Sequence, residues 1–171
     1  MSFSADIPLW LLIGLPGSGK STWAENFRQS GPAIAYVSTD QIRQQLFGNE
    51  ATQGSWPQVW QRVIHEWQQA VQQTRQGEIY GALYDATNAQ RRGRHQVIKT
   101  ARLLGFTRLI AIWLDVHLVE CLRRNHGRSR QVPTAVIQTM SRQLIGAPPH
   151  PSEGFDAVYR LRPDLLPGRE S

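Results

Sequence analysis

Cysteine, lysine and long apolar runs are scarce in this sequence of 171 residues, which contains only Cys121 and two lysines. A single cysteine excludes an internal disulfide framework and a zinc site built from cysteines. A membrane span needs about 20 consecutive apolar residues, and no segment approaches that length. The amino-terminal stretch also lacks a basic region and a small-residue cleavage site, which argues against a signal peptide. We therefore expect a cytoplasmic protein with no membrane partner.

The composition indicates one folded domain. Apolar residues make up 40% of the chain and charged residues 19%, values typical of a globular rather than a disordered protein. There is no internal repeat, low-complexity tract or linker, so we expect a single domain over residues 1–171. The five histidines show no spacing typical of metal ligands, and no feature of the sequence indicates an oligomeric state.

The positive charge is concentrated in the middle of the chain. Residues 86–145 contain 11 basic residues against Asp115 and Glu120, a net charge of +9, whereas residues 1–85 and 146–171 carry −2 and −1. Arginine supplies 17 of the 19 basic residues. This favours an anionic ligand of some size, such as a nucleotide, a nucleic acid or another polyphosphate. A general preference for arginine on solvated faces is the alternative, but it does not explain the concentration in one third of the chain.

Apolar runs alternate with amphipathic stretches along the chain. The pattern predicts strands over 9–13, 33–37, 79–84, 106–114 and 156–161. It predicts helices over 21–28, 40–47, 56–76, 91–104, 117–125 and 133–145, and a loop over 48–55. Gly105 is expected to cap the fourth helix, and Pro133 to occupy the first turn of the sixth. This alternation predicts a three-layer α/β domain with a central parallel sheet of about five strands.

The long helix predicted over 56–76 carries an apolar stripe that includes Trp56, Trp60 and Trp67. Aromatic side chains at this spacing usually pack in a core, and we expect that role for all three. Stacking on nucleic acid bases is the alternative interpretation.

A glycine-rich loop follows the first predicted strand. Residues 14–22 have the sequence GLPGSGKST, which fits the pattern G-x-x-x-x-G-K-[ST] between a strand and a helix. The glycines let backbone N–H groups point at the phosphates of a nucleotide, and the following helix adds its positive N-terminal dipole. A glycine-rich turn without function is the alternative. The residues expected to bind the phosphates are Gly14, Leu15, Pro16, Gly17, Ser18, Gly19, Lys20, Ser21 and Thr22.

A magnesium site is expected beside this loop. Lys20 would reach the β- and γ-phosphates, and Ser21 would bind Mg2+ through its hydroxyl. Asp85 ends the third predicted strand, where an acid can hold the hydration shell of Mg2+ or accept a hydrogen bond from Ser21. The alternative for Asp85 is a turn-initiating aspartate.

An acid and an arginine follow the second predicted strand. Asp40 lies just beyond Val37, and Arg43 lies one helical turn further on. Ligands of a doubly wound sheet bind outside the carboxyl ends of its strands. We therefore expect Asp40 to act as the general base for an acceptor hydroxyl, and Arg43 to bind a phosphate of the acceptor. The alternative for Asp40 is a helix cap, a role that Ser38 or Thr39 could also fill.

An arginine-rich connector joins the last two predicted helices. Arg124, Arg128 and Arg130 fall on or beside a glycine-containing stretch that suits a lid over approximately 124–133. Such a lid would close on the triphosphate, with Arg128 neutralising charge during transfer. Solvated surface arginines are the alternative interpretation.

Together these segments resemble the kinase domain of phage and bacterial polynucleotide 5′-hydroxyl kinases, within the wider group of small P-loop kinases. The resemblance extends from Leu11 to about Leu161 and includes the phosphate loop with Trp23 and Ala24, the element TDQIR at 39–43, and the segment DATN at 85–88. In the phage enzyme the acid directly precedes Thr-Asn, whereas Ala86 intervenes here. The resemblance implies ATP and Mg2+ as cofactors, Asp40 as the general base, and Arg124 and Arg128 as contacts of the ATP phosphates.

The acceptor has more than one interpretation. The leading hypothesis is transfer of the ATP γ-phosphate to a 5′-hydroxyl end of RNA or DNA, because the charge of +9 is large enough to bind a backbone beyond one nucleotide. A kinase of a small molecule, such as a sugar, antibiotic or metabolite, needs no extended basic groove. An ATP-binding or ATP-hydrolysing module without an acceptor is the third hypothesis, and the pair of Asp40 and Arg43 counts against it.

Overall fold

The computed structural model describes residues 6–48 and 54–162. Its helices and strands follow the predicted alternation closely. The elements in chain order are β1 (Pro8–Ile13), α1 (Lys20–Ser30), β2 (Ala35–Ser38), α2 (Thr39–Phe47), α3 (Trp56–Arg75), β3 (Ala82–Asp85), α4 (Arg91–Leu104), β4 (Arg108–Leu114), α5 (Leu118–His126), α6 (Thr134–Gly146), a short 3-10 helix (Pro151–Glu153) and β5 (Ala157–Leu161). Most of the predicted loop over 48–55 lies outside the described residues.

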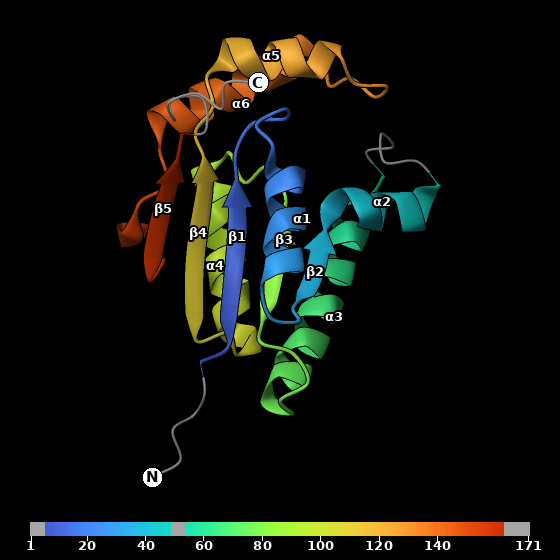
Figure 1. The fold of residues 1–171 in the computed structure, drawn as a ribbon, viewed down its shortest axis with the longest axis vertical. Helices are drawn as coiled ribbons and strands as arrows, with labels where there is room; N and C mark the ends of the chain where they lie inside the picture. The colour runs from blue at the N-terminus through green and yellow to red at the C-terminus, as the bar shows by residue number, and fades with distance from the viewer. Residues whose placement is uncertain (1–5, 49–53, 163–171) are drawn as a thin grey trace.

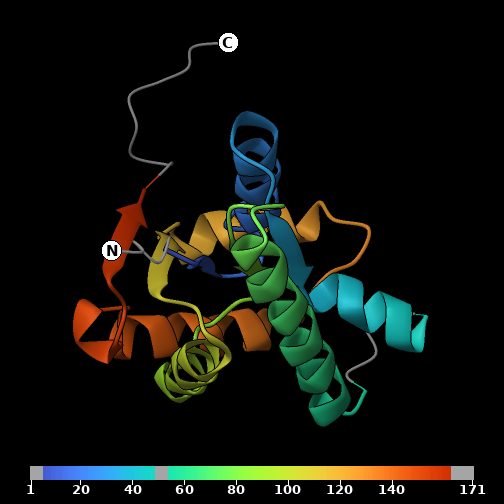
Figure 2. The ribbon, with the colours of Figure 1, turned by 90° about the horizontal axis from the view of Figure 1, so that it is seen from below.

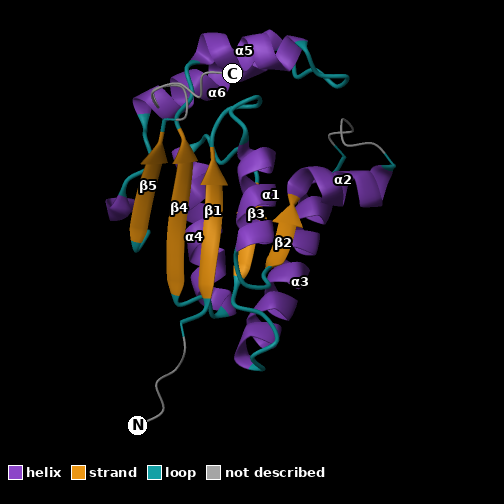
Figure 3. Ribbon diagram, viewed as in Figure 1, coloured by secondary structure: helices purple, strands orange, loops and turns teal. Residues whose placement is uncertain are grey.

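The five strands form one parallel sheet in the order β2-β3-β1-β4-β5 (Figures 1 and 3). β1 lies at the centre, paired with β3 on one side and β4 on the other. Because all strands are parallel, their carboxyl ends meet at one edge of the sheet. The phosphate loop, the start of α2 and the segment after β3 therefore converge at that edge.

Helices cover both faces of the sheet, which confirms the predicted three-layer α/β fold. α1 lies on one face, and α3 and α4 lie on the other (Figures 1 and 2). Leu12 and Leu83 pack with Ala24 of α1, while Leu11 and Tyr84 belong to the core on the opposite side. These strands are apolar without alternation because both of their faces are buried.

α5 and α6 lie across the carboxyl edge of the sheet, above β1 and β4 in Figure 1. The arginine-rich lid predicted over approximately 124–133 begins in the last turn of α5 and continues through the loop to α6. Gly105 caps α4 as predicted, with a left-handed φ of 109° and its N–H donating to Ala101 and Arg102. Pro133, however, is the N-cap of α6 and not a first-turn residue, because its ψ of 134° is extended.

β3 begins at Ala82, three residues later than predicted. The preceding Gly81 lies against β1 so closely that a Cβ there would be 2.4 Å from the carbonyl oxygen of Pro8. The Tyr80 N–H still donates to the Ala33 carbonyl. The residues just before β3 therefore still form a hydrogen bond to the segment before β2, although the regular strand begins only at Ala82. No helix within 6–48 and 54–162 is long and apolar enough to cross a membrane.

The apolar stripe of α3 is buried along only part of its length. Trp67 is fully buried in the core as predicted, Trp60 is half-buried, and Trp56 is 46% exposed. The core interpretation is therefore wrong for Trp56. The first turn of α3 lies beside α2 at the rim of the sheet, where Trp56 faces a cavity.

Candidate active site

A cavity of about 1100 Å³ lies at the carboxyl edge of the sheet. This volume is near the upper end of the roughly 300–1,000 Å³ typical of small-molecule sites. Its lining comes from the phosphate loop, the start of α2, the segment after β3, the first turns of α3 and α4, and the connector between α5 and α6. The structure thus brings together Lys20, Ser21, Asp40, Asp85 and Arg128, which the sequence predicted as site residues.

The phosphate loop needs glycine at two positions, and at one of them for two reasons. Gly17 and Gly19 have φ values of 83° and 92°, in the left-handed region that other residues seldom adopt. A Cβ on Gly17 would also lie 2.6 Å from the carbonyl oxygen of Cys121 in α5. The loop is therefore packed directly beneath α5, with no room for a side chain between them.

The N-terminus of α1 is open to the cavity. Its N-cap, Gly19, supplies no side-chain cap, and no acid lies in the first turn. The first N–H groups of a helix have no partner within the helix, so those of Lys20, Ser21 and Thr22 are available to an anion. Gly19, Lys20, Ser21 and Thr22 all line the cavity, whereas Leu15 lines a second cavity behind the loop. The arrangement fits the phosphate chain of a nucleotide.

Lys20 bends back onto the loop. Its Nζ donates to the carbonyl oxygens of Gly14 and Leu15 at 2.9 and 2.8 Å. Burial lowers the pKa of Lys20 to about 8, against the attraction of the Asp85 carboxylate, while the positive charge of Arg128 lowers it further. Lys20 is thus a partly desolvated cation that a phosphate would stabilise.

Asp85 is buried at the end of β3 and holds two hydroxyl groups. Its Oδ2 accepts a hydrogen bond of 2.6 Å from Tyr36 and one of 3.3 Å from Ser21. Burial and the adjacent carboxylate raise the pKa of Tyr36 above its ordinary value, so the phenol remains a donor. Asp85 in β3 therefore connects β2 with the start of α1 in the phosphate loop.

The oxygen atoms of Ser21 and Asp85 fit Mg2+, which takes few protein ligands and keeps water and phosphate oxygens as the others. Within the described residues no cluster of three or more His, Cys, Asp or Glu side chains could hold a metal by itself. A magnesium site here would depend on the phosphates of a nucleotide.

Asp40 and Arg43 form an ion pair on the first turn of α2, with 3.1 Å between Oδ1 and Nη1. The Ser38 hydroxyl caps this helix by accepting from the Gln41 N–H, so Asp40 is not the cap. The Asp40 side chain is 60% exposed and lines the cavity with Arg43. The carboxylate is thus paired with Arg43 on one side and open to the cavity on the other.

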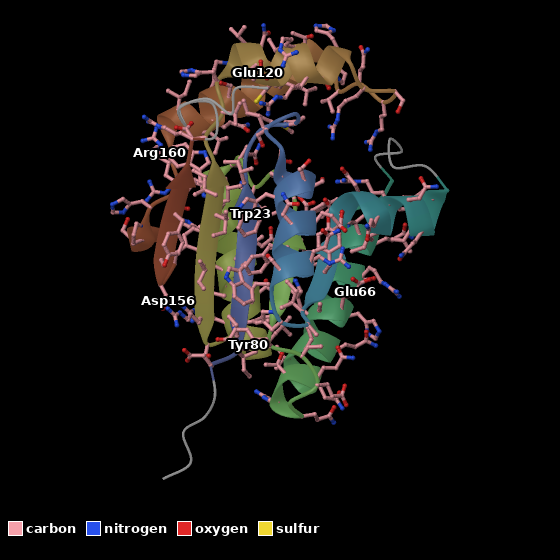
Figure 4. All side chains as sticks on the ribbon, in the orientation of Figure 1. Trp23, Glu66, Tyr80, Glu120, Asp156 and Arg160 are labelled. Carbon is pink, nitrogen blue, oxygen red and sulfur yellow. The ribbon has the colours of Figure 1, made fainter. Side chains whose placement is uncertain are left out.

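The predicted lid is a loop closed at its base by Asn125. This buried side chain donates to the Val132 carbonyl at 2.8 Å and accepts from the Val132 N–H at 2.9 Å. Arg128, between these two residues, lines the cavity. Arg124 instead contacts the Gly17 carbonyl at 3.4 Å and pairs with Glu120, which Figure 4 shows on α5.

Several arginines of residues 86–145 pair with acids and do not line the cavity, so the net charge of +9 is not gathered at one site. Arg94 is buried against Glu153, and Arg123 pairs with Glu120. Arg102 pairs with Asp156, which lies at the end of β5 away from α5 (Figure 4). The arginines that line the cavity are Arg43, Arg92, Arg128 and Arg130.

Sequence reasoning missed several residues that organise the site. Tyr36 looks like any strand residue, and its contact with Asp85 spans 49 positions. Arg94 holds the carbonyl oxygens of Asn88 and Ala89 beside the cavity and forms two hydrogen bonds to Glu153. The one sign of this role in the sequence is that Arg94 falls on the apolar stripe of α4, with Val97 and Ile98.

Comparisons with known proteins agree with this geometry. The model of the family AAA_33, described as "AAA domain", matches residues 9–146. A chain of the Pnkp1/Rnl/Hen1 RNA repair complex is 21% identical with a TM-score of 0.68, and the match covers 85% of this chain and 46% of that one. This chain therefore spans about half the length of that protein.

Two enzymes of nearly the same length share the fold. Shikimate kinase from Bacteroides thetaiotaomicron is 14% identical with a TM-score of 0.58, over 95% of this chain and 90% of that one. A sugar kinase from Janibacter is 15% identical with a TM-score of 0.60, over 92% and 85%. At these identities the likeness establishes the fold, which is that of a small P-loop kinase, and the resemblance stated from the sequence is confirmed at that level.

Proposed function

Since the chain belongs to the AAA_33 family of AAA domains and has the fold of small P-loop kinases, we propose that it is an ATP-dependent phosphotransferase acting on a 5′-hydroxyl end of RNA or DNA. The observation that carries the proposal is that one cavity contains both a phosphate-binding loop and the exposed Asp40–Arg43 pair. A module that only bound or hydrolysed ATP would need no carboxylate for an acceptor.

Each residue has a defined task in this proposal. Bound ATP with Mg2+ would supply the γ-phosphoryl group and neutralise part of its charge. Lys20 and the N–H groups at the start of α1 would bind the β- and γ-phosphates, while Ser21 and Asp85 would hold the metal. Asp40 would accept the proton of the attacking hydroxyl, and Arg128 would stabilise the negative charge during transfer.

A nucleic acid end is the acceptor that the charges favour. Arg43, Arg92, Arg128 and Arg130 line the same cavity as the phosphate loop and Asp40, so several positive charges lie near the proposed acceptor site. Arg43 adjoins the proposed base, so an acceptor with a phosphate close to its reactive hydroxyl fits both residues. The similar fold of a chain in an RNA repair complex supports the same class of acceptor.

A kinase of a small molecule is the second candidate. The likeness to shikimate kinase and to a sugar kinase over most of their lengths favours it. Such an acceptor carries few charges, so its phosphorylation would depend less on salt than that of an oligonucleotide.

Incubation of the protein with labelled ATP, Mg2+ and a panel of acceptors tests the proposal. The panel contains 5′-hydroxyl oligonucleotides of RNA and DNA, nucleoside 3′-phosphates, nucleosides, sugars and shikimate. We expect label on the oligonucleotides and nucleoside 3′-phosphates, with a rate that falls as salt increases. Label only on a sugar, on shikimate or on another small alcohol would establish the second candidate instead.

A further inference from the structure

Two tryptophans of α3 form a stack at the mouth of the cavity. The rings of Trp56 and Trp60 lie 6.0 Å apart with an interplanar angle of 21°. Trp56 is 46% exposed, although a ring of this size normally buries most of its surface. Both rings line the cavity that contains Asp40.

The outer ring is fixed in place by a series of aromatic contacts that leads into the core. Trp60 meets the fully buried Trp67 edge to face at 5.6 Å. Trp67 contacts Tyr84 of β3 at 5.1 Å and Phe106 at 6.0 Å, also edge to face. Because the inner rings are buried, the stack holds Trp56 in position, and a ligand could contact the exposed part of the ring without first ordering it.

Arg43 connects this stack to the proposed base. Its guanidinium carbon lies 5.8 Å from the centroid of Trp56, near the limit of about 6 Å for a cation–π contact. Its Nη1 also contacts Asp40. The carboxylate, the guanidinium and the indole therefore follow one another along one wall of the cavity.

A nucleotide extends from its ribose in three directions, to the 5′-hydroxyl, the 3′-phosphate and the base. Asp40 fits the hydroxyl and Arg43 fits the phosphate. We propose that Trp56 stacks with the nucleobase of the 5′-terminal nucleotide of the acceptor, an inference that rests on the proposed function. Every base has a π-face, so the contact would bind all four bases with little discrimination.

The test compares two 5′-hydroxyl acceptors that share the 3′-phosphate linkage, one with a normal 5′-terminal base and one with an abasic sugar in its place. We expect Trp56→Ala to raise KM for the base-bearing acceptor by ~10-fold, from the usual energy of base–aromatic stacking, with kcat changed by less than about twofold. KM for the abasic acceptor should not change. Trp56→Phe should retain most of the affinity and provides a variant that keeps the aromatic packing.

The matched control is Tyr159→Ala, which removes an exposed aromatic ring of β5 that does not line the cavity. It should leave both acceptors unaffected. An equal rise in KM for the two acceptors with Trp56→Ala would overturn the stacking role, because the ring would then contact the sugar or support the fold, while the proposed function would stand.

A binding measurement separates this inference from the proposed function. A 5′-deoxy nucleoside 3′-phosphate cannot accept a phosphoryl group, but it retains the base. We expect it to quench tryptophan fluorescence in the wild type and markedly less in Trp56→Phe, whereas its abasic counterpart quenches neither. The absence of a difference between Trp56→Phe and the wild type would refute the stacking. Failure of the wild type to phosphorylate any 5′-hydroxyl nucleotide would refute the proposed function, whatever the quenching result.

Discussion

The hydroxyl of Tyr36 donates a hydrogen bond of 2.6 Å to Oδ2 of Asp85, the same oxygen that the Ser21 hydroxyl contacts at 3.3 Å. Tyr36 lies in β2 and Asp85 at the end of β3, two adjacent parallel strands. A carboxylate held by a phenol from one side keeps a fixed orientation towards the phosphate loop. We therefore propose that Tyr36 positions Asp85 for the magnesium site.

Tyr36→Phe should raise the concentration of Mg2+ that gives half-maximal rate by ~10-fold, without abolishing transfer. A hydrogen bond to a charged group contributes about 1.5–3 kcal/mol. At saturating Mg2+ the rate should be within about threefold of the wild type, since Asp85 and Ser21 remain. Magnesium titrations of this variant and of the control Tyr159→Phe measure the effect. Identical titration curves for all three proteins would remove Tyr36 from the site.

Nucleotide affinity should decrease above about pH 8. The pKa of Lys20 is about 8 because burial disfavours its charge, and a bound phosphate would raise that pKa. Below this pH the lysine is already charged, so affinity stays constant. Above it, binding requires uptake of a proton, and affinity should fall by up to ~10-fold per pH unit. Calorimetry at pH 9 in two buffers of different ionisation enthalpy should show proton uptake, which Lys20→Met should lose. Constant affinity between pH 7 and 9.5 would contradict this assignment.

Arg128→Ala should reduce kcat by ~10- to 1000-fold if the guanidinium stabilises the transferring phosphoryl group. The control is Arg123→Ala, which removes an arginine paired with Glu120 on the exposed side of α5. It should change kcat by less than about twofold. Steady-state rates at saturating ATP and acceptor compare the two variants. A similarly small effect of Arg128→Ala would show that the lid arginine has no part in transfer.

Arg43→Ala should distinguish between classes of acceptor. With a nucleoside 3′-phosphate, KM should rise by ~10- to 100-fold, because a charge-assisted contact worth about 1.5–3 kcal/mol is lost. With the corresponding nucleoside, which lacks the phosphate, the variant and the wild type should differ little. Equal losses on both acceptors would exclude the phosphate contact and favour a small-molecule acceptor.

The parts of the fold that depend on local sequence could be predicted, and those that depend on distant partners could not. The phosphate loop and the capping glycine Gly105 follow from backbone requirements of single residues. The hydrogen bond from Tyr36 to Asp85 joins two strands and leaves no local pattern. The charge count of residues 86–145 overestimated the basic surface because Glu153, far along the chain, neutralises the buried Arg94.

Trp56 shows the same limit for apolar residues. Helical periodicity places it on the same stripe as Trp67, but periodicity does not reveal where the core ends and a cavity begins. The departure from the expected pattern falls at the candidate site, where local rules are most often broken for function.

The most direct test of the central claim is the rate of Asp40→Asn with ATP and a 5′-hydroxyl oligonucleotide. Ser38 caps α2 and the Asp40 carboxylate is exposed, so the substitution should preserve the fold and ATP binding. Loss of a general base should nevertheless lower kcat by ~100-fold or more. Glu25→Gln, at an exposed acid of α1, should match the wild type. A rate for Asp40→Asn within about threefold of the wild type would contradict the assignment of Asp40 as the base.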